Sequence, residues 1–373
     1  MQQQESVLIN ILNFTDAQIA GAGVFTRNLL SEWLRVDTRS IVVYHSRSID
    51  PTILFNLPAN RSLCKKPIAV KSIFFRILYE QFVLPFKLRS YSIYFSPTPA
   101  IPFLARIISP GTRLIITIHD MIPFFIPHKY GWLRGRYVRW ISKYGAIHAD
   151  HVITVSENSK RDILKISKIA VDKITVVYNF IADLGFEPVG GKSDYFLSIS
   201  TIEPGKNIEI TMDGFKLFTE RHPSGSHRFY WVGKVGWGYT LDYLHSLIDQ
   251  KGLSGKFILL GFVSEERKNE LLRGCIAVVY LSHYEGFGLG VLEGFYFNKP
   301  AIVSSGSSLP EVVGDAGILC DHLDANDVAD AFYRMTIELS KFQREIPDRI
   351  SAFRKESQLK KFLSVINSKD FIV

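Results

Sequence analysis

"IAVVYLSHYEGFGLGVLEGF", residues 276–295, carries the signs of a strand, a loop and a helix in succession. It begins with a short apolar run rich in β-branched side chains, which is typical of a buried strand. Glycines at 286, 288 and 290 follow, and the stretch from Gly290 onward has helical potential. We therefore predict a strand, a loop that carries Glu285, and a helix that carries Glu293 about one turn from its start.

The same alternation of apolar runs and amphipathic segments extends along the chain. It runs from "VLINILNF" (7–14) to "KITVVYNF" (173–180), and again from "YFLSIS" (195–200) to "PAIVSSG" (300–306). Repeated strand–helix units of this kind form a parallel sheet covered by helices. The pattern stops at residues 181–194, a stretch of Gly, Pro and acidic residues, where we place the interdomain linker.

We expect an α/β protein with two Rossmann-like, doubly wound parallel-sheet domains that face each other across a cleft. A chain of 373 residues is long enough for two such domains, each with its own core. The first domain is expected over residues 1–185 and the second over 186–350. Residues 351–373 are expected to form a C-terminal helix that packs back on the first domain.

Composition favours a cytoplasmic protein. Hydrophobic residues make up 47% and charged residues 21%, and no apolar run approaches the ~18 residues of a membrane-spanning helix. The N-terminus lacks the features of a signal peptide. Cys64, Cys275 and Cys320 have no metal-binding spacing, so we expect reduced thiols and neither zinc nor a disulfide. The net charge of +8 indicates an anionic partner: nucleic acid, acidic lipid or a phosphorylated substrate.

The first strand-to-helix turn, "GAGVFT" (21–26), bears on dinucleotide binding. Thr26 stands where the GxGxxG fingerprint needs its third glycine, which argues against a nicotinamide-dependent oxidoreductase. Gly21 and Gly23 would still let a phosphate or a sugar approach the backbone at a helix N-terminus. A tight turn that needs a positive φ explains them equally well.

Glu285 and Glu293 are too far apart to act on a single bond. Eight residues of helical rise separate them by on the order of 10 Å, beyond the ~5 to 9.5 Å at which two carboxylates flank one glycosidic bond. Such a pair can grip the two ends of a ligand, with the backbone N–H groups of residues 287–289 between them. A nucleotide diphosphate sugar has hydroxyls at both ends and negative charge in the middle. The alternative is two solvated glutamates and a glycine turn.

"EGFGLGVLE" (285–293) resembles the EX7E signature of the retaining nucleotide-sugar glycosyltransferases of family 4, which have the GT-B fold. Four more stretches are similar to segments of that family in the expected order. They are "TIHDMIPF" (117–124), "VITVSENSKRDI" (152–163), "STIEPGKN" (200–207) and "SSLPEVVGDAG" (307–317). The resemblance implies that the first domain binds the acceptor and the second the nucleotide sugar.

The resemblance also assigns roles to single residues. Glu293 would hold the donor ribose, and Glu285 would act beside the transferred sugar as a catalytic residue. Lys206 would bind the diphosphate and stabilise the leaving group, for which a compact positive charge is suited. His119 would contact the donor sugar at the reacting centre, with Asp120 orienting it.

Other positions complete the predicted donor site or depart from the family pattern. The backbone of Phe287, Gly288 and Leu289 is expected to bind the donor. Gly205 stands where the family often has an arginine, which leaves Lys234 as a candidate second cation for the phosphates. Gly290 replaces a proline that is common in the family.

The resemblance implies a front-side reaction that retains the anomeric configuration, with the diphosphate as base. No DxD-like motif is found in the matched region, so we expect neither a metal nor another cofactor. GDP-mannose is the favoured donor, and UDP-glucose, UDP-N-acetylglucosamine or a deoxysugar donor are alternatives. The expected acceptor is a glycan or a lipid-linked glycan of cell-surface polysaccharide synthesis. A catalytically inactive relative that binds nucleotide sugars or glycans is a further alternative.

Two basic, aromatic segments indicate peripheral membrane contact. Residues 129–144 interleave five Lys and Arg with Trp and Tyr, and residues 65–89 are also basic and apolar. Such segments can rest on anionic headgroups at the inner face of a membrane. An amphipathic helix with inward-packed aromatics is the alternative for 129–144. No nucleic-acid-binding module accompanies the basic residues, so nucleic acid is not the expected partner.

Overall fold

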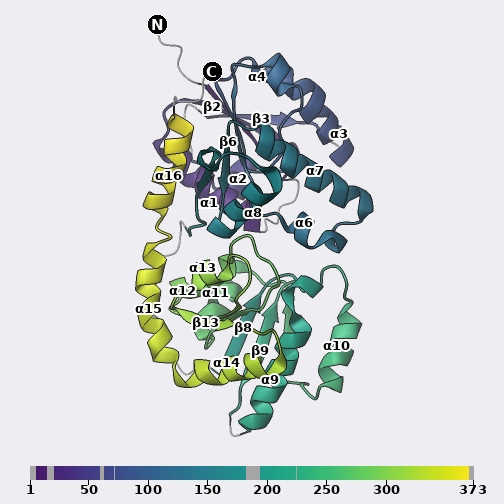
Figure 1. The fold of residues 1–373 in the computed structure, drawn as a ribbon, viewed down its shortest axis with the longest axis vertical. Helices are drawn as coiled ribbons and strands as arrows, with labels where there is room; N and C mark the ends of the chain where they lie inside the picture. The colour runs from purple at the N-terminus through teal and green to yellow at the C-terminus, as the bar shows by residue number, and fades with distance from the viewer. Residues whose placement is uncertain are drawn as a thin grey trace. The chain divides into compact units, whose positions relative to one another are not determined.

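The computed structural model describes residues 6–14, 21–58, 63–70, 72–181, 194–223 and 225–368. The chain divides into two compact units (Figure 1). Unit 1 comprises Met1–Ala182 together with Lys355–Val373, and unit 2 comprises Asp183–Arg354. Each unit contains one parallel sheet, so the prediction of two doubly wound parallel sheets is confirmed. Most of the predicted linker, residues 182–193, lies outside the described residues.

The sheet of unit 1 has seven strands in the order β3-β2-β1-β4-β5-β6-β7. They are β1 (Ser6–Asn10), β2 (Ser40–Ser46), β3 (Leu63–Ile68), β4 (Ile93–Ser96), β5 (Arg113–Thr117), β6 (His151–Thr154) and β7 (Ile174–Val176). The central strands are buried, as near-continuous apolar sequences with helices on both faces require. The strand order changes direction between β1 and β4, which makes their carboxyl ends a switch point where α/β sheets bind ligands.

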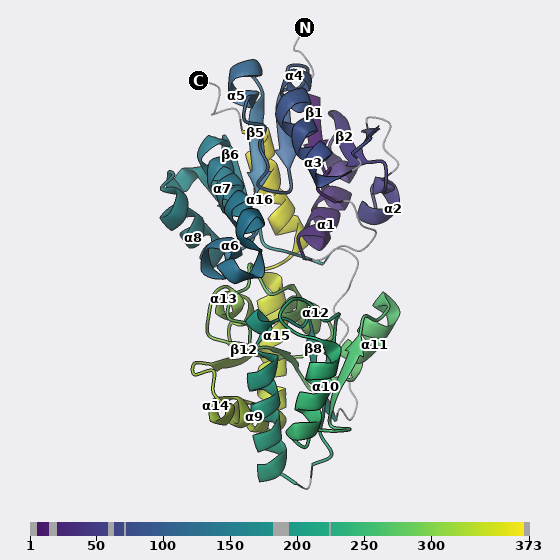
Figure 2. The same cartoon turned by 90° about the vertical axis from the view of Figure 1, so that its right-hand side faces the viewer.

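Helices cover this sheet, and Figure 2 looks onto the side of unit 1 that carries α3, α4, α5, α6 and α7. The helical segments are α1 (Gly21–Val36), α2 (Pro51–Phe55), α3 (Ile73–Leu78), the π-helix η1 (Tyr79–Val83), α4 (Leu84–Leu88), α5 (Ala105–Ile108), α6 (Ile122–Phe125), the 3-10 helix η2 (Pro127–Lys129), α7 (Trp132–His148), α8 (Glu157–Ser167), the 3-10 helix η3 (Val171–Lys173) and α16 (Lys355–Asn367). Side-chain caps fix some of the helix starts. The hydroxyl of Ser156, for example, accepts the N–H of Ser159 and begins α8.

The last helix, α16, completes the core of unit 1. The ring of Phe362 lies edge-on to Trp33 at 4.9 Å and to Phe95 at 5.4 Å between centroids. The guanidinium of Arg113 donates to the carbonyl of Ser368 at 2.5 Å and also to that of Val365. A C-terminal helix was expected from residue 351; it begins at Lys355 and belongs to unit 1.

The sheet of unit 2 has six strands in the order β10-β9-β8-β11-β12-β13, all parallel. They are β8 (Tyr195–Ile199), β9 (Arg228–Val232), β10 (Phe257–Gly261), β11 (Val278–Tyr280), β12 (Ala301–Ser304) and β13 (Gly317–Cys320). The helical segments are the 3-10 helix η4 (Pro204–Lys206), α9 (Ile208–Arg221), α10 (Leu241–Gln250), α11 (Glu265–Gly274), α12 (Leu289–Tyr296), α13 (Leu309–Val313), α14 (Ala325–Ile337) and α15 (Leu339–Ser351). The switch point of this sheet lies between β8 and β11.

Candidate active site

Two loops that bear predicted site residues lie side by side in unit 2. One loop follows β8 and carries Lys206, and the other follows β11 and carries Glu285. The N–H of His283 donates to the carbonyl of Gly205 at 2.9 Å, and Nδ2 of Asn207 donates to the carbonyl of Leu281 at 2.6 Å. Because β8 and β11 flank the switch point, both loops emerge where α/β sheets bind ligands.

Lys206 and Glu285 form an ion pair at this point. Nζ of Lys206 lies 2.5 Å from Oε1 of Glu285, and the hydroxyl of Ser282 donates to the same oxygen at 2.7 Å. Both side chains are mostly buried. The structure therefore brings together the ammonium group expected to bind phosphate and the carboxylate expected beside the sugar.

A third loop fixes the backbone around Glu285. The hydroxyl of Ser307 accepts the N–H of Glu285 at 2.9 Å. The hydroxyl of Ser308 donates to the carbonyls of Glu285 and Phe287, at 2.9 and 2.8 Å. The loop before α13 thus holds Glu285 in place, which gives a structural role to the "SSLPEVV" stretch.

Glu293 lies in α12, as predicted, and is paired with a residue that the sequence did not single out. Nζ of Lys268, in α11, lies 2.8 Å from Oε1 of Glu293 and 2.9 Å from Oε2 of Glu265. Burial lowers the pKa of Lys268, but the charge of Glu293 and hydrogen bonds to both carboxylates outweigh it, and the pKa is raised overall. Each glutamate of the predicted pair is therefore held by a lysine from a neighbouring element.

Tyr280, at the end of β11, lies near the two acids. Its hydroxyl donates to the carbonyl of Ile199 at 3.0 Å. Burial raises the pKa of Tyr280 well above its usual value, and the charges of Glu293 and Glu285 raise it further. The phenol is thus a neutral hydrogen-bond donor that ties the end of β11 to the end of β8.

The start of α12 has the geometry of a backbone binding site. Gly288 is the N-cap residue, with a φ of 115° that favours glycine, and Leu289 begins the helix. The ring of Phe287 is buried and lies 5.6 Å from that of Phe353, so only its backbone faces the loop. Lys234 is exposed, and its carbonyl accepts the N–H of Ile202 at 2.9 Å, beside the loop that carries Lys206.

His119 lies in unit 1, just beyond β5. Its Nε2 donates to the carbonyl of Pro97 at 3.0 Å, and the ring of Phe25 lies edge-on at 5.2 Å. Burial lowers the pKa of His119 to about 4, so the ring is neutral and Nδ1 is an acceptor. The carboxylate of Asp120 accepts the N–H of Ile122 at 3.0 Å.

Gly21 and Gly23 occupy the first turn of α1, close in sequence to Phe25. Gly23 is buried, whereas a side chain on Gly21 would meet no atom within 4 Å. Phe25 connects this turn to His119 through the ring contact. The three predicted site residues of unit 1 therefore belong to one neighbourhood.

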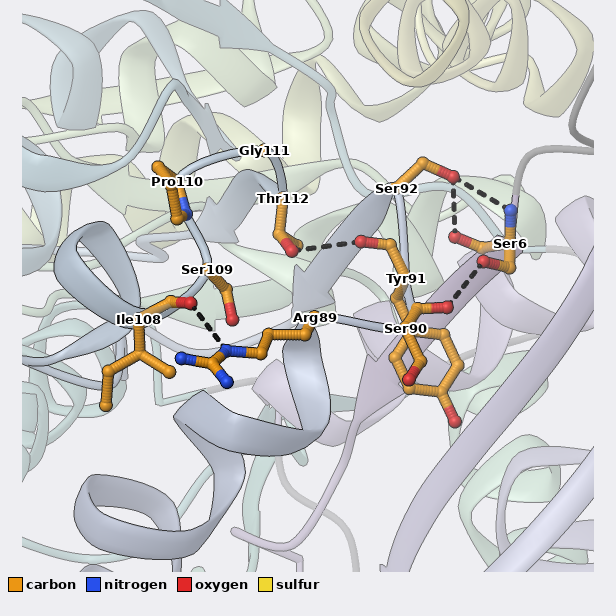
Figure 3. A pocket seen from close by; sticks show the side chains of 10 residues that line it. All are labelled: Ser6, Arg89, Ser90, Tyr91, Ser92, Ile108, Ser109, Pro110, Gly111 and Thr112. Carbon is orange, nitrogen blue, oxygen red and sulfur yellow. Dashed lines mark hydrogen bonds between the residues drawn. The ribbon is translucent and has the colours of Figure 1, made fainter.

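A separate pocket of about 520 Å³ opens at the other edge of the same sheet (Figure 3). It lies at the amino ends of β1, β4 and β5 and is lined by serines, Thr112 and Arg89. Its polar groups bond one another: Thr112 donates to the carbonyl of Tyr91 at 2.9 Å, and the N–H of Ser6 donates to the hydroxyl of Ser92 at 2.9 Å. None of the predicted site residues lines this pocket.

The described residues also bear on metal binding, thiol chemistry and membrane spanning. Within the described ranges, no three His, Cys, Asp or Glu side chains gather as a metal site. The three cysteines, all of which the structure describes, are free: Cys64 is exposed, and Cys275 and Cys320 are buried. Of the helices in the described part of the chain, none is long and apolar enough to span a bilayer.

Comparison with known protein families supports the resemblance to glycosyltransferases that the sequence motifs indicated. The model for "Glycosyltransferase Family 4" matches residues 19–183, and the model for "Glycosyl transferases group 1" matches residues 184–344. The chain is 30% identical over 230 residues to O-antigen chain mannosyltransferase B of Escherichia coli, covering 58% of this chain and 59% of that protein. It is 27% identical over 238 residues to the O-antigen chain mannosyltransferase RfbU of Salmonella typhimurium, covering 64% and 63%. These matches span less than two thirds of either relative's length.

Solved structures share the fold. Anabaena Alr3699/HepE in complex with UDP-glucose superposes with a TM-score of 0.72 at 16% identity, covering 97% of this chain and 99% of that one. The sucrose-phosphate synthase of Thermosynechococcus elongatus has a TM-score of 0.73 at 15% identity, covering 97% and 98%. The two family matches follow each other without a gap over residues 19–344, and the chain belongs to the family 4 glycosyltransferases with the GT-B fold.

Proposed function

We propose that this protein transfers mannose from GDP-mannose to a hydroxyl of a glycan or lipid-linked acceptor in cell-surface polysaccharide synthesis, with retention of anomeric configuration. One observation carries the proposal: Lys206 and Lys268 pair with the two glutamates of the EX7E stretch, Glu285 and Glu293. The mannosyltransferases to which the chain is similar support the choice of sugar.

The residues of unit 2 account for donor binding. Lys206 would leave Glu285 to bind the diphosphate, since phosphate oxygens carry more charge than one carboxylate. The N-terminus of α12 would add backbone N–H groups and its positive dipole end. Oε1 of Glu293 is already held by Lys268, which would leave its second oxygen to accept hydrogen bonds from the ribose hydroxyls.

Glu285 and Lys206 would also stabilise the charges that develop during the reaction. As the sugar–phosphate bond weakens, positive charge develops on the sugar ring and negative charge on the diphosphate. Glu285 would stabilise the ring, and Lys206 the leaving group. The departing diphosphate oxygen would take the proton of the attacking acceptor hydroxyl on the same face, so that configuration is retained. His119, neutral and with Nδ1 as an acceptor, would bind a hydroxyl of the sugar.

We also propose that the protein acts at the inner face of a membrane and that it uses no metal cofactor. A lipid-linked acceptor would bring a cytoplasmic protein to the inner face of a membrane, which the basic aromatic segments 65–89 and 129–144 also favour. Lys206 and the N-terminus of α12 supply positive charge to the diphosphate, the role that a divalent ion has in other transferases.

A thermal-shift panel of GDP-, UDP- and dTDP-sugars, with EDTA present, tests the donor. GDP-mannose should raise the melting temperature most, and the shift should survive EDTA. NMR of the product formed on a synthetic lipid-linked acceptor should show the α-anomer that matches the donor. A stabilising UDP-sugar would correct the donor, an inverted product would overturn the mechanism, and no shift with any donor would overturn the function.

A further inference from the structure

Positive charge is concentrated in one stretch of unit 1. Residues 51–149 contain fourteen Lys and Arg residues and only two Asp and Glu residues, a net charge of +12 in a chain whose total is +8. The rest of the chain is therefore slightly acidic. One of the two acids, Glu80, is buried, so it does not offset the positive charge at the surface.

The segment from α3 through η1 to α4 exposes its phenylalanines and buries two polar side chains, the reverse of what a surface helix ordinarily does with these residue types. Two of its polar residues, Glu80 and Gln81, face the core: Oε1 of Glu80 accepts from Nδ2 of Asn10 at 3.1 Å, and Oε1 of Gln81 accepts the N–H of Phe103 at 2.8 Å. Its phenylalanines face solvent, and Phe74 and Phe82 are 65% and 61% exposed. The buried polar contacts fix the segment in this orientation, because breaking them would leave buried polar groups such as the amide of Asn10 without these hydrogen bonds.

A second group of exposed apolar side chains lies on α6 and α7. Trp132 is 74% exposed, and Leu133, Phe125 and Trp140 also reach solvent. The alternative that α7 packs all its aromatics inward is therefore wrong for Trp132. Trp140 lies partly inward, with its ring 4.5 Å from that of Phe103.

Phe103 joins the two groups into one surface. The backbone N–H of Phe103 donates to the side-chain oxygen of Gln81 in η1, and its ring packs on Trp140 of α7. The helices α3, α4, α6 and α7 accordingly appear together on the side of unit 1 that faces the viewer in Figure 2. We call this surface the aromatic face; its exposed apolar members are Ile73, Phe74, Phe75, Phe82, Val83, Phe86, Phe125, Trp132, Leu133 and Trp140.

Basic side chains accompany the aromatic face. The guanidinium of Arg136 lies 5.4 Å from the ring centre of Trp132, and that of Arg89 lies 5.7 Å from that of Phe86. Lys87 and Arg134 are also exposed on α4 and α7. Exposed Phe and Trp beside Arg and Lys match the boundary of an anionic bilayer, where rings enter the interface and cations meet headgroups.

We propose that the aromatic face docks unit 1 on an anionic lipid bilayer, with the phenylalanines of α3, η1 and α4 and Trp132 of α7 inserted at the headgroup boundary. A nucleic acid fits less well, because aliphatic residues such as Ile73 and Leu133 share the surface and offer no stacking platform. The proposal does not require sugar transfer, so it can be tested without donor or acceptor.

Co-sedimentation of the full chain with vesicles tests the proposal. Binding should be clear with phosphatidylcholine vesicles that contain about 30% phosphatidylglycerol, weak with phosphatidylcholine alone, and reduced by salt. The double variant Phe74→Ser/Phe82→Ser should lose binding about tenfold or more. Phe262→Ser is the matched control, since Phe262 is 68% exposed in unit 2 and should not matter. Melting temperatures of all variants check folding.

Tryptophan fluorescence gives an independent measurement. Anionic vesicles should shift the emission of the wild type to the blue, and Trp132→Phe should remove most of that shift. Equal binding to neutral and anionic vesicles, no binding to either, or unchanged binding of the double variant would each overturn the proposal. A dimer in light scattering that the double variant abolishes would instead assign the aromatic face to a second copy of the chain and would also overturn it.

Discussion

The hydroxyl of Tyr280 fills the space in which a side chain at Gly290 would lie. A Cβ atom built on Gly290 would be 1.7 Å from the tyrosine oxygen. That oxygen is itself fixed by its hydrogen bond to the carbonyl of Ile199 at 3.0 Å. The glycine that replaces a proline common in the family is therefore matched to a tyrosine beneath the loop, and the two residues form one structural unit.

Gly290→Ala should destabilise unit 2. Because Tyr280 is buried and hydrogen-bonded, the loop or the ring must move, which typically costs about 1–3 kcal/mol. Urea unfolding measures the change in the free energy of unfolding. Gly111→Ala is the control, since a side chain there would meet no atom within 4 Å. Equal stabilities of the two variants would contradict the steric argument.

Glu285→Gln should separate binding from turnover. The amide keeps the shape of the side chain but loses the charge, so turnover should fall about 10²–10³-fold. The thermal shift caused by the donor should largely persist, because Lys206 and Glu293 remain. Glu270→Gln, on the exposed side of α11, is the control and should leave both quantities unchanged. Full activity of Glu285→Gln would show that the charge of Glu285 has no role in the reaction.

Lys268→Met should weaken donor binding through Glu293. The lysine holds one carboxylate oxygen at 2.8 Å, and without it Glu293 loses its fixed orientation. We expect KM for the donor to rise about tenfold with little change in kcat, as loss of one charged hydrogen bond implies. The preference for a ribose over a 2′-deoxyribose nucleotide should shrink as well, which a merely structural role would not cause. Arg267→Met, the neighbouring exposed position, should match the wild type.

Unit 1 should lose stability as the pH falls from about 6.5 towards 4. Burial lowers the pKa values of both His119 and His151 to about 4, from an ordinary value of 6.5. Between these values the unfolded chain binds protons that the folded chain does not, so acid favours unfolding. His151→Asn should flatten the pH dependence of the free energy of unfolding. His245→Asn, at an exposed position, should follow the wild-type curve.

The sequence predicted what depends on local pattern. Alternating strands and helices gave the two parallel sheets, and the positions of Glu285 in a loop and Glu293 in a helix were correct. Lys268 was missed because it lies in a highly charged helix where a single lysine has no distinguishing signal. Its partner Glu293 follows 25 residues later, and only the fold of the intervening strand brings the two together.

The sequence predicted membrane contact for residues 65–89, but not which side chains of that segment face the core. A carboxylate such as Glu80 is ordinarily exposed and a phenylalanine such as Phe82 buried, so composition alone predicts the opposite orientation. The hydrogen bond from Asn10, 70 residues away, reverses it. Long-range polar contacts of this kind cannot be read from hydrophobic periodicity.

Because α16 belongs to unit 1 but follows unit 2 in the chain, unit 1 cannot be completed until unit 2 has been synthesised. Trp33 and Phe95 can contact Phe362, and Arg113 the carbonyls beyond it, only after α16 has been made. A nascent unit 1 therefore keeps an apolar surface uncovered throughout the translation of unit 2, and a stop codon before α16 would leave the core of unit 1 incomplete although unit 2 is intact.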